Sequence, residues 1–161
     1  MPAAVTARTK LRIEIEQRFL PLIRQRGFEG PAKLSGNQIL HEFFRSTSEG
    51  RQCLSIQFEK YRKPRVVLNL AMEPTVGFES FMQSGGTIVQ GTVTWKPGGM
   101  TGSWFRADRP LWHRLLGRHG TTESAAVTAM ISCLNEIDRW WDTQTETVHI
   151  RVLSITHPAS D

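Results

Sequence analysis

Polar and apolar side chains alternate along the stretch Cys53-Leu-Ser-Ile-Gln-Phe-Glu59. Successive side chains of a β-strand point to opposite faces of a sheet, so this alternation predicts a strand with one apolar face. The apolar face consists of Leu54, Ile56 and Phe58. The opposite face carries the remaining side chains of the stretch, and it is mainly polar.

Two similar stretches flank this one along the chain. Residues 39–45 precede it and residues 66–71 follow it, with short polar or charged links between them. Links of this length join antiparallel neighbours, whereas a parallel crossover needs a dozen or more residues. A fourth strand is predicted over residues 87–95, between glycine-containing turns at 84–86 and 96–99. The centre of the chain therefore predicts an antiparallel sheet.

Helical periodicity marks both ends of the chain. Between residues 9 and 26, apolar side chains recur every three or four positions, which predicts an amphipathic helix with a kink or restart at Pro21. A second such stripe predicts a helix over residues 121–141, and a short helix is expected over residues 110–117. Residues 146–155 are compatible with a closing strand or with a continued helix.

This order of elements predicts an α+β fold: an antiparallel sheet of about four or five strands, with an N-terminal helix and C-terminal helices packed on one face. The chain has 161 residues, enough for one domain and short of two. We expect a single domain over residues 1–161, with an ordered core at about 9–155. The sequence contains no signal-like or membrane-spanning apolar run, so we expect a cytoplasmic protein without a membrane partner.

Positive charge is concentrated in the first half of the chain. Residues 1–80 carry 13 basic and 8 acidic side chains and residues 81–161 carry 7 of each, so the net charge of +5 belongs to the first half. A basic half can attract nucleic acid, phosphates or an acidic protein surface, although it can also serve only as a solvated face. The densest basic run surrounds Tyr61, whose ring could stack on a base. Its candidate phosphate contacts are Lys60, Arg62, Lys63 and Arg65.

The spacing of reactive side chains matches no catalytic or metal-binding motif. Cys53 and Cys133 lie outside any CxxC pattern, and the five histidines show neither HxH nor HExxH spacing. We therefore predict no metal, no cofactor and no catalytic residue. A less favoured alternative is an enzyme with a small polar pocket. The candidate residues of that pocket are Gln57, Glu59 and Asn69.

Tryptophan is enriched toward the C-terminal end, with five residues against one tyrosine and four of the five between positions 104 and 141. Trp140 and Trp141 point about 100° apart on a helix, so we expect only one of them to face the centre of the core and the other to lie at a rim, under a loop or in an interface. Tryptophan and arginine dominate binding hot spots, which suggests a binding patch. Its candidate residues are Trp104, Arg106 and Trp140.

These observations favour a non-catalytic interaction module that binds a protein or a small ligand through one sheet face or through the tryptophan-rich part. The alternative is a nucleic-acid-associated protein that uses its basic half. A homodimer is a further possibility, because a surface left uncovered by the fold can serve as a dimer face.

Several short segments carry a family resemblance. They are Arg26-Gly-Phe28, residues 54–60, Val66-Val-Leu-Asn-Leu70, the region 104–112 and Trp140-Trp141. Over about residues 10–142 they resemble the bacterial domain-of-unknown-function family 4304. The resemblance implies an α+β domain and supplies no catalytic residues. The chain departs from the family's pattern in a long insertion at 79–86 and in the tail after Asp142.

Overall fold

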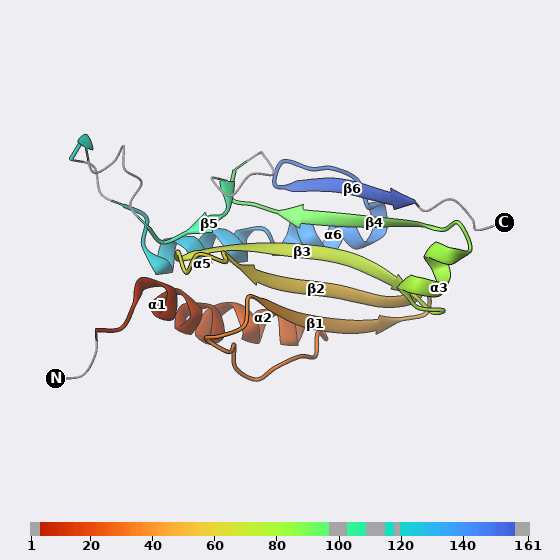
Figure 1. The fold of residues 1–161 in the computed structure, drawn as a ribbon, viewed down its shortest axis with the longest axis horizontal. Helices are drawn as coiled ribbons and strands as arrows, with labels where there is room; N and C mark the ends of the chain where they lie inside the picture. Colours follow the sequence, from red (N-terminus) through yellow and green to blue (C-terminus); the bar gives the residue numbers. More distant parts are fainter. Residues whose placement is uncertain (1–3, 97–102, 109–114, 118–119, 157–161) are drawn as a thin grey trace.

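The computed structural model describes residues 4–96, 103–108, 115–117 and 120–156. Within them, six antiparallel strands form one sheet in the order β1-β2-β3-β4-β6, and the short β5 pairs with the start of β3 (Figure 1). The strands are β1 Leu40–Thr47, β2 Gly50–Phe58, β3 Arg65–Pro74, β4 Thr87–Val93, β5 Phe105–Arg106 and β6 Ile150–Thr156. The predicted antiparallel sheet is confirmed, and residues 150–156 form the closing strand rather than a continued helix.

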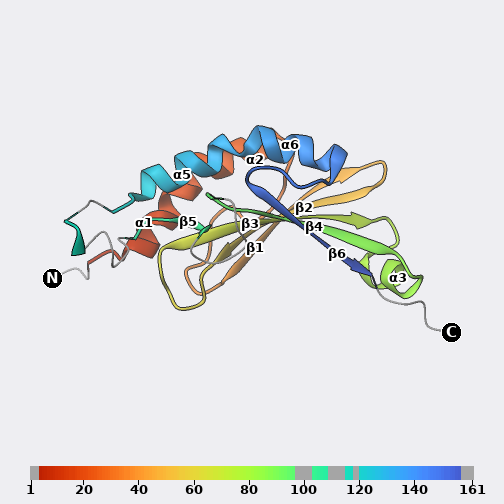
Figure 2. The ribbon, with the colours of Figure 1, turned by 90° about the horizontal axis from the view of Figure 1, so that it is seen from above.

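Helices cover one face of this sheet. Figure 2 shows the N-terminal helices and the pair α5 and α6 side by side above the strands, whereas α3 lies at one end of the sheet. The helices are α1 Ala7–Glu14, the π-helical turn η1 Ile15–Phe19, α2 Leu20–Gln25, α3 Phe78–Gln83, α5 Glu123–Ser132 and α6 Leu134–Thr143. The predicted α+β architecture with helices on one face is therefore confirmed.

The segments α1, η1 and α2 follow one another directly and form one N-terminal helix from Ala7 to Gln25. These bounds are close to the predicted residues 9–26. The disturbance expected at Pro21 takes the form of the π-helical turn η1 directly before it, where the N–H of Leu20 donates to the carbonyl of Ile15. Proline has no N–H to donate and crowds the preceding turn, and a widened turn accommodates both effects. The wide turn thus keeps the apolar stripe facing the sheet.

Two of the helix predictions need correction. The helix predicted over residues 121–141 is divided into α5 and α6 at Cys133, whose N–H donates to the carbonyl of Met130 at 3.1 Å. Helix α3 was not predicted, because it lies in the segment interpreted as an insertion. The short helix predicted over 110–117 falls largely outside the described residues.

The core lies between the sheet and the helices, and it includes Leu54, Ile56 and Phe58 as predicted. Both tryptophans of the adjacent pair are buried. Trp140 is fully buried, and Trp141 is 5% exposed. Trp141 is covered by Phe28, with ring centroids 6.0 Å apart.

Phe28 reaches that position because Gly27 ends the N-terminal helix with a positive φ of 86°. The N–H of Phe28 then donates to the carbonyl of Ile23 at 3.1 Å. A left-handed residue after the last turn is the usual end of a helix, and glycine adopts it without strain. None of the helices in the described part of the chain is long and apolar enough to span a membrane.

Candidate functional site

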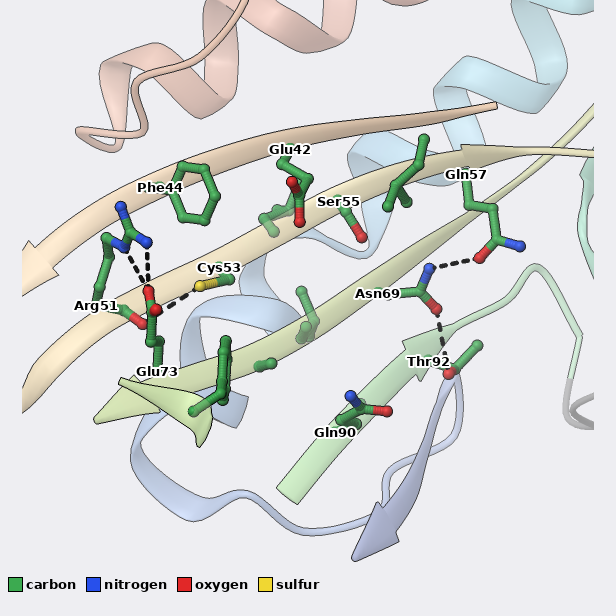
Figure 3. A pocket seen from close by; sticks show the side chains of 16 residues that line it. Glu42, Phe44, Arg51, Cys53, Ser55, Gln57, Asn69, Glu73, Gln90 and Thr92 are labelled. Carbon is green, nitrogen blue, oxygen red and sulfur yellow. Dashed lines mark hydrogen bonds and ion pairs between the residues drawn. The ribbon is translucent and has the colours of Figure 1, made fainter. Parts of the chain in front are cut away.

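The sheet face opposite the helices contains a hollow of about 540 Å³. Strands β1 to β4 form its floor, and Phe78 of α3 contributes to its rim. Figure 3 shows the lining side chains from close by. Its polar and charged lining residues are Glu42, Arg51, Ser55, Gln57, Asn69, Glu73, Gln90 and Thr92.

Strand alternation explains why this face is polar. The same alternation that buries the apolar side chains of β2 against the helices directs its intervening side chains into the hollow. Strand register then aligns the polar positions. One row across the sheet consists of Glu42, Ser55, Asn69, Thr92 and Arg151. Directly opposed side chains in antiparallel strands lie about 5 Å apart at Cβ, so a single ligand can contact several of them.

A short hydrogen-bonded chain crosses the hollow at the end away from Arg51 and Glu73 (Figure 3). The side-chain amide of Asn69 donates to the amide oxygen of Gln57 at 2.9 Å. The hydroxyl of Thr92 in turn donates to the amide oxygen of Asn69 at 3.4 Å. These bonds hold three polar side chains of β2, β3 and β4 in fixed positions.

Three other polar side chains in the hollow are free to bind. Within the described parts of the chain, Glu42, Ser55 and Gln90 make no side-chain hydrogen bond or ion pair, and all three line the hollow. Ser55 of β2 lies directly beside Asn69, Gln90 of β4 lies diagonally across from it, and Glu42 lies one strand further out on β1. A carboxylate, a hydroxyl and an amide together offer both donors and acceptors.

One end of the hollow is closed by an ion pair. The guanidinium of Arg51 donates to the carboxylate of Glu73 at 2.6 Å and stacks on the ring of Phe44, 4.1 Å from its centroid. The charged lining residues are thus two carboxylates and one guanidinium, with the exposed Glu42 as the unpaired charge. The lining of the hollow therefore has no excess of cations to attract a polyanion.

The thiol of Cys53 also lines the hollow. Burial raises its pKa to about 11, with the Glu73 carboxylate adding to the effect and Arg51 opposing it. A thiol with this pKa stays protonated at neutral pH, and the thiolate is the nucleophilic form. Cys53 is therefore a weak nucleophile where it stands.

The predicted polar pocket is assembled only in part. Gln57 and Asn69 lie in the hollow and are hydrogen-bonded to each other. Glu59 does not belong with them: it is 7% exposed and accepts hydrogen bonds from the N–H groups of Tyr61 and Lys63, at 2.8 and 3.3 Å. Its carboxylate caps the turn between β2 and β3. Sequence alternation put it on the polar face, but the strand ends at Phe58, before Glu59.

The predicted basic cluster lies on that β2–β3 turn. Lys60, Arg62 and Lys63 are exposed, and Tyr61 is 71% exposed with the ammonium of Lys60 4.8 Å from its ring centroid. Arg65 differs from the other cations because it donates to the carboxylate of Asp108 at 2.9 Å. The free cations of this turn are therefore three rather than four.

The predicted tryptophan patch is wrong in its central member. Trp140 is fully buried beneath the sheet and cannot contribute to a surface. Arg106 donates to the carboxylate of Asp108 at 2.6 Å, so its charge is paired. Trp104 is partly exposed. The predicted pocket did not include Glu42, Ser55 and Gln90, although their positions in alternating strands were visible.

Comparison of the chain with models of protein families, with curated proteins and with solved structures gives no match in any of the three. The resemblance to family 4304 accordingly stays a proposal.

Proposed function

We propose that this protein is a non-catalytic binding module that holds a small, polar, nearly uncharged molecule in the hollow of its open sheet face. The observation that carries the proposal is the set of three unpartnered polar side chains, Glu42, Ser55 and Gln90, in the same hollow as the hydrogen-bonded Asn69. Fixed neighbours with free donors and acceptors between them are the usual layout of a site that orients a ligand.

The size and the charge of the hollow support this class of ligand. A volume of about 540 Å³ lies in the range typical of small-molecule sites, roughly 300–1,000 Å³. Binding sites usually present few polar groups, whereas this one presents many, which favours a ligand with several hydrogen-bonding groups. One unpaired carboxylate, Glu42, favours a ligand with at most a single positive charge. The raised pKa of Cys53 supports reversible binding rather than covalent chemistry.

The proposal is tested by titrating the isotopically labelled protein with amino acids, nucleosides, monosaccharides and dipeptides while following its amide resonances by NMR. We expect one class to shift amides of β2, β3 and β4 around Ser55, Asn69 and Thr92. Shifts confined to the helices, or no shift from any of the four classes at millimolar concentration, would contradict the proposal.

A matched pair of variants sharpens this test. Thr92→Val removes a hydroxyl inside the hollow, whereas Thr87→Val makes the same change on the same strand outside the lining. We expect Thr92→Val to weaken binding about two- to tenfold, the value of one hydrogen bond, and Thr87→Val to leave it unchanged. Equal effects of the two variants would show that the hollow is not the site.

A second candidate function, nucleic-acid association, is supported by the β2–β3 turn. There, an exposed tyrosine ring stands among three exposed cations, Lys60, Arg62 and Lys63. Two other basic residues of the first half already have partners: Arg12 donates to the carbonyl of Leu34 at 2.8 Å, and Arg18 donates to Thr128 at 2.8 Å.

The nucleic-acid candidate predicts salt-dependent binding of single-stranded RNA. Three phosphate contacts give a slope of about −2 in a plot of log K against log salt concentration. Replacing Lys60, Arg62 and Lys63 by Gln should abolish the binding. The control removes three exposed lysines elsewhere, Lys10, Lys33 and Lys96, and should preserve most of it. Equal loss of RNA binding in both variants would show that the interaction depends on net charge and not on the β2–β3 turn.

A further inference from the structure

A cluster of three potential metal ligands lies on the helix side of the molecule, away from the hollow. Cys133 separates α5 from α6, Glu136 follows in the first turn of α6, and His149 directly precedes β6. The thiol sulfur, a carboxylate oxygen and an imidazole nitrogen lie within 4.8 Å of one another. The cluster did not stand out in the sequence because its histidine is distant from the other two residues.

Helix geometry brings the first two ligands together. Residues three apart on a helix share a face, so the spacing of Cys133 and Glu136 directs both side chains to the same side. The third ligand is fixed by the sheet, because the N–H of Thr94 donates to the carbonyl of His149 at 2.9 Å. Two ligands therefore belong to the junction of α5 and α6, and the third lies at the end of the α6–β6 connection, where its backbone is bonded to the sheet.

The carboxylate of Glu136 is oriented through both oxygens. Its Oε2 lies 2.8 Å from Nδ1 of His149. Its Oε1 accepts from the N–H of His149 at 2.9 Å and from the hydroxyl of Thr147. The Thr147 hydroxyl and the backbone N–H of His149 can orient this carboxylate as a metal ligand, because hydrogen bonds from groups outside the ligand set commonly fix the ligand direction. The contact between Oε2 and Nδ1 joins two of the proposed ligands and would be replaced when both bind the ion.

We propose that Cys133, Glu136 and His149 bind one zinc-type divalent cation, with a fourth coordination position left for water or another ligand. Zinc takes thiolate, imidazole and carboxylate ligands at about 2.0–2.3 Å, and three protein ligands with one open position form a familiar zinc arrangement. Magnesium and calcium prefer all-oxygen sites, so the thiol selects against them. In a tetrahedral site such ligand atoms lie roughly 3.3–3.8 Å apart, so small side-chain rotations would bring these atoms into place.

Metal binding at this cluster releases one proton, from the thiol of Cys133. The ion takes a deprotonated Cys133 sulfur, the neutral His149 imidazole and the ionised Glu136 carboxylate, and the thiol proton leaves to solvent. Without a metal, burial and the nearby Glu136 carboxylate raise the pKa of the Cys133 thiol to about 11. A coordinated cation reverses this preference by stabilising the thiolate directly. His149 is partly exposed and gives the ion a path to the buried sulfur.

The ordinary alternative is a structural contact, in which the Glu136–His149 pair anchors β6 to α6 beside an inert buried thiol. The two readings differ in whether the thiol ever binds a metal. The inference is independent of the hollow on the opposite sheet face, so neither proposal depends on the other.

Cobalt substitution tests the inference on the full chain after removal of metals with a chelator. Co²⁺ bound to a thiolate produces a charge-transfer absorption in the near ultraviolet, and Zn²⁺ should displace it. We expect one Co²⁺ per chain and a band that persists in Cys53→Ser but disappears in Cys133→Ser. The two variants make the same change at the two cysteines of the chain. No thiolate band in the unmodified protein, or a band that Cys53→Ser abolishes, would overturn the inference.

Further variants keep the test decisive if Cys133→Ser does not fold. Glu136→Gln and His149→Gln should each weaken Zn²⁺ binding by at least tenfold, and Thr147→Val should weaken it about tenfold through the orientation of Glu136. The control Thr143→Val changes an exposed threonine near the end of α6 and should leave the affinity unchanged. Affinity that is unchanged in both Glu136→Gln and His149→Gln would overturn the inference as well.

Discussion

Replacing Gly91 by alanine probes the packing that supports both faces of the sheet. Gly91 lies in β4, where its backbone contributes to the hollow and its other side contacts Trp140. A Cβ atom at this position would lie 2.9 Å from Cε2 of Trp140, 3.0 Å from Cζ2 and 3.1 Å from Cγ2 of Ile150. The glycine is therefore required by a close approach, not by an unusual backbone angle.

The contacts set the size of the effect. Carbon atoms pack at about 3.5–4.0 Å, so the new methyl group would overlap a rigid ring that has little room to move. Trp140 also packs edge-on against Trp141, with ring centroids 5.2 Å apart. Overpacking of this kind costs about 1–3 kcal/mol, and removal of a glycine from a strand returns about 0.5–1 kcal/mol. We expect a net destabilisation of about 1–2 kcal/mol, or a Tm lower by about 2–8 °C.

Urea unfolding followed by tryptophan fluorescence measures this change. The control is Gly36→Ala, where a Cβ would meet only the Arg12 guanidinium at 3.7 Å, an ordinary contact. That variant should be as stable as the unmodified protein, or more stable by up to about 1 kcal/mol. If Gly91→Ala unfolds at the same urea concentration as Gly36→Ala, the close packing of Trp140 under β4 is wrong.

Three predictions concern protonation. Partial burial raises the pKa of Asp108, but hydrogen bonds from Arg106 and Arg65 outweigh this effect and lower the pKa overall. In urea unfolding, the unmodified protein should therefore be more stable than Asp108→Asn above about pH 4, and this difference should shrink below about pH 4. Burial lowers the pKa of His41 in the folded protein, so as the pH falls the unfolded state binds a proton at this residue before the folded state does. Between about pH 6.5 and 5, the unmodified protein should therefore lose more stability than His41→Phe; equal losses would contradict this. Modification of Cys53 by a disulfide reagent should accelerate about tenfold per pH unit from pH 8 to 10, whereas a plateau above pH 9 would contradict its raised pKa.

The strands and their faces were predictable because alternation is a local property. The pattern of residues 53–59 separates Leu54, Ile56 and Phe58 from Ser55 and Gln57 without reference to the rest of the chain. It does not say where pairing stops, and this is why Glu59 was placed in the pocket. The strand ends at Phe58 and the carboxylate caps the next turn.

Arrangements that depend on distant segments could not be predicted in this way. Helical spacing correctly separates the directions of Trp140 and Trp141, yet both are buried, because Phe28 from the end of the N-terminal helix covers the second ring. Likewise, Gln90 reaches the hollow only through the pairing of β4 with β3, and the approach of His149 to Cys133 depends on the position of β6.

Since every helix that buries the sheet lies on one of its faces, successive positions of a single strand are subject to different constraints. Alternate residues of β2 hold the core together, and those between them face the hollow or solvent. Substitutions at exposed sites usually change stability by no more than about 0.5 kcal/mol. Glu42 and Gln90 are exposed and Ser55 is partly exposed, so the three positions could be randomised together while the fold is preserved, which makes this sheet face a scaffold for selecting binding proteins.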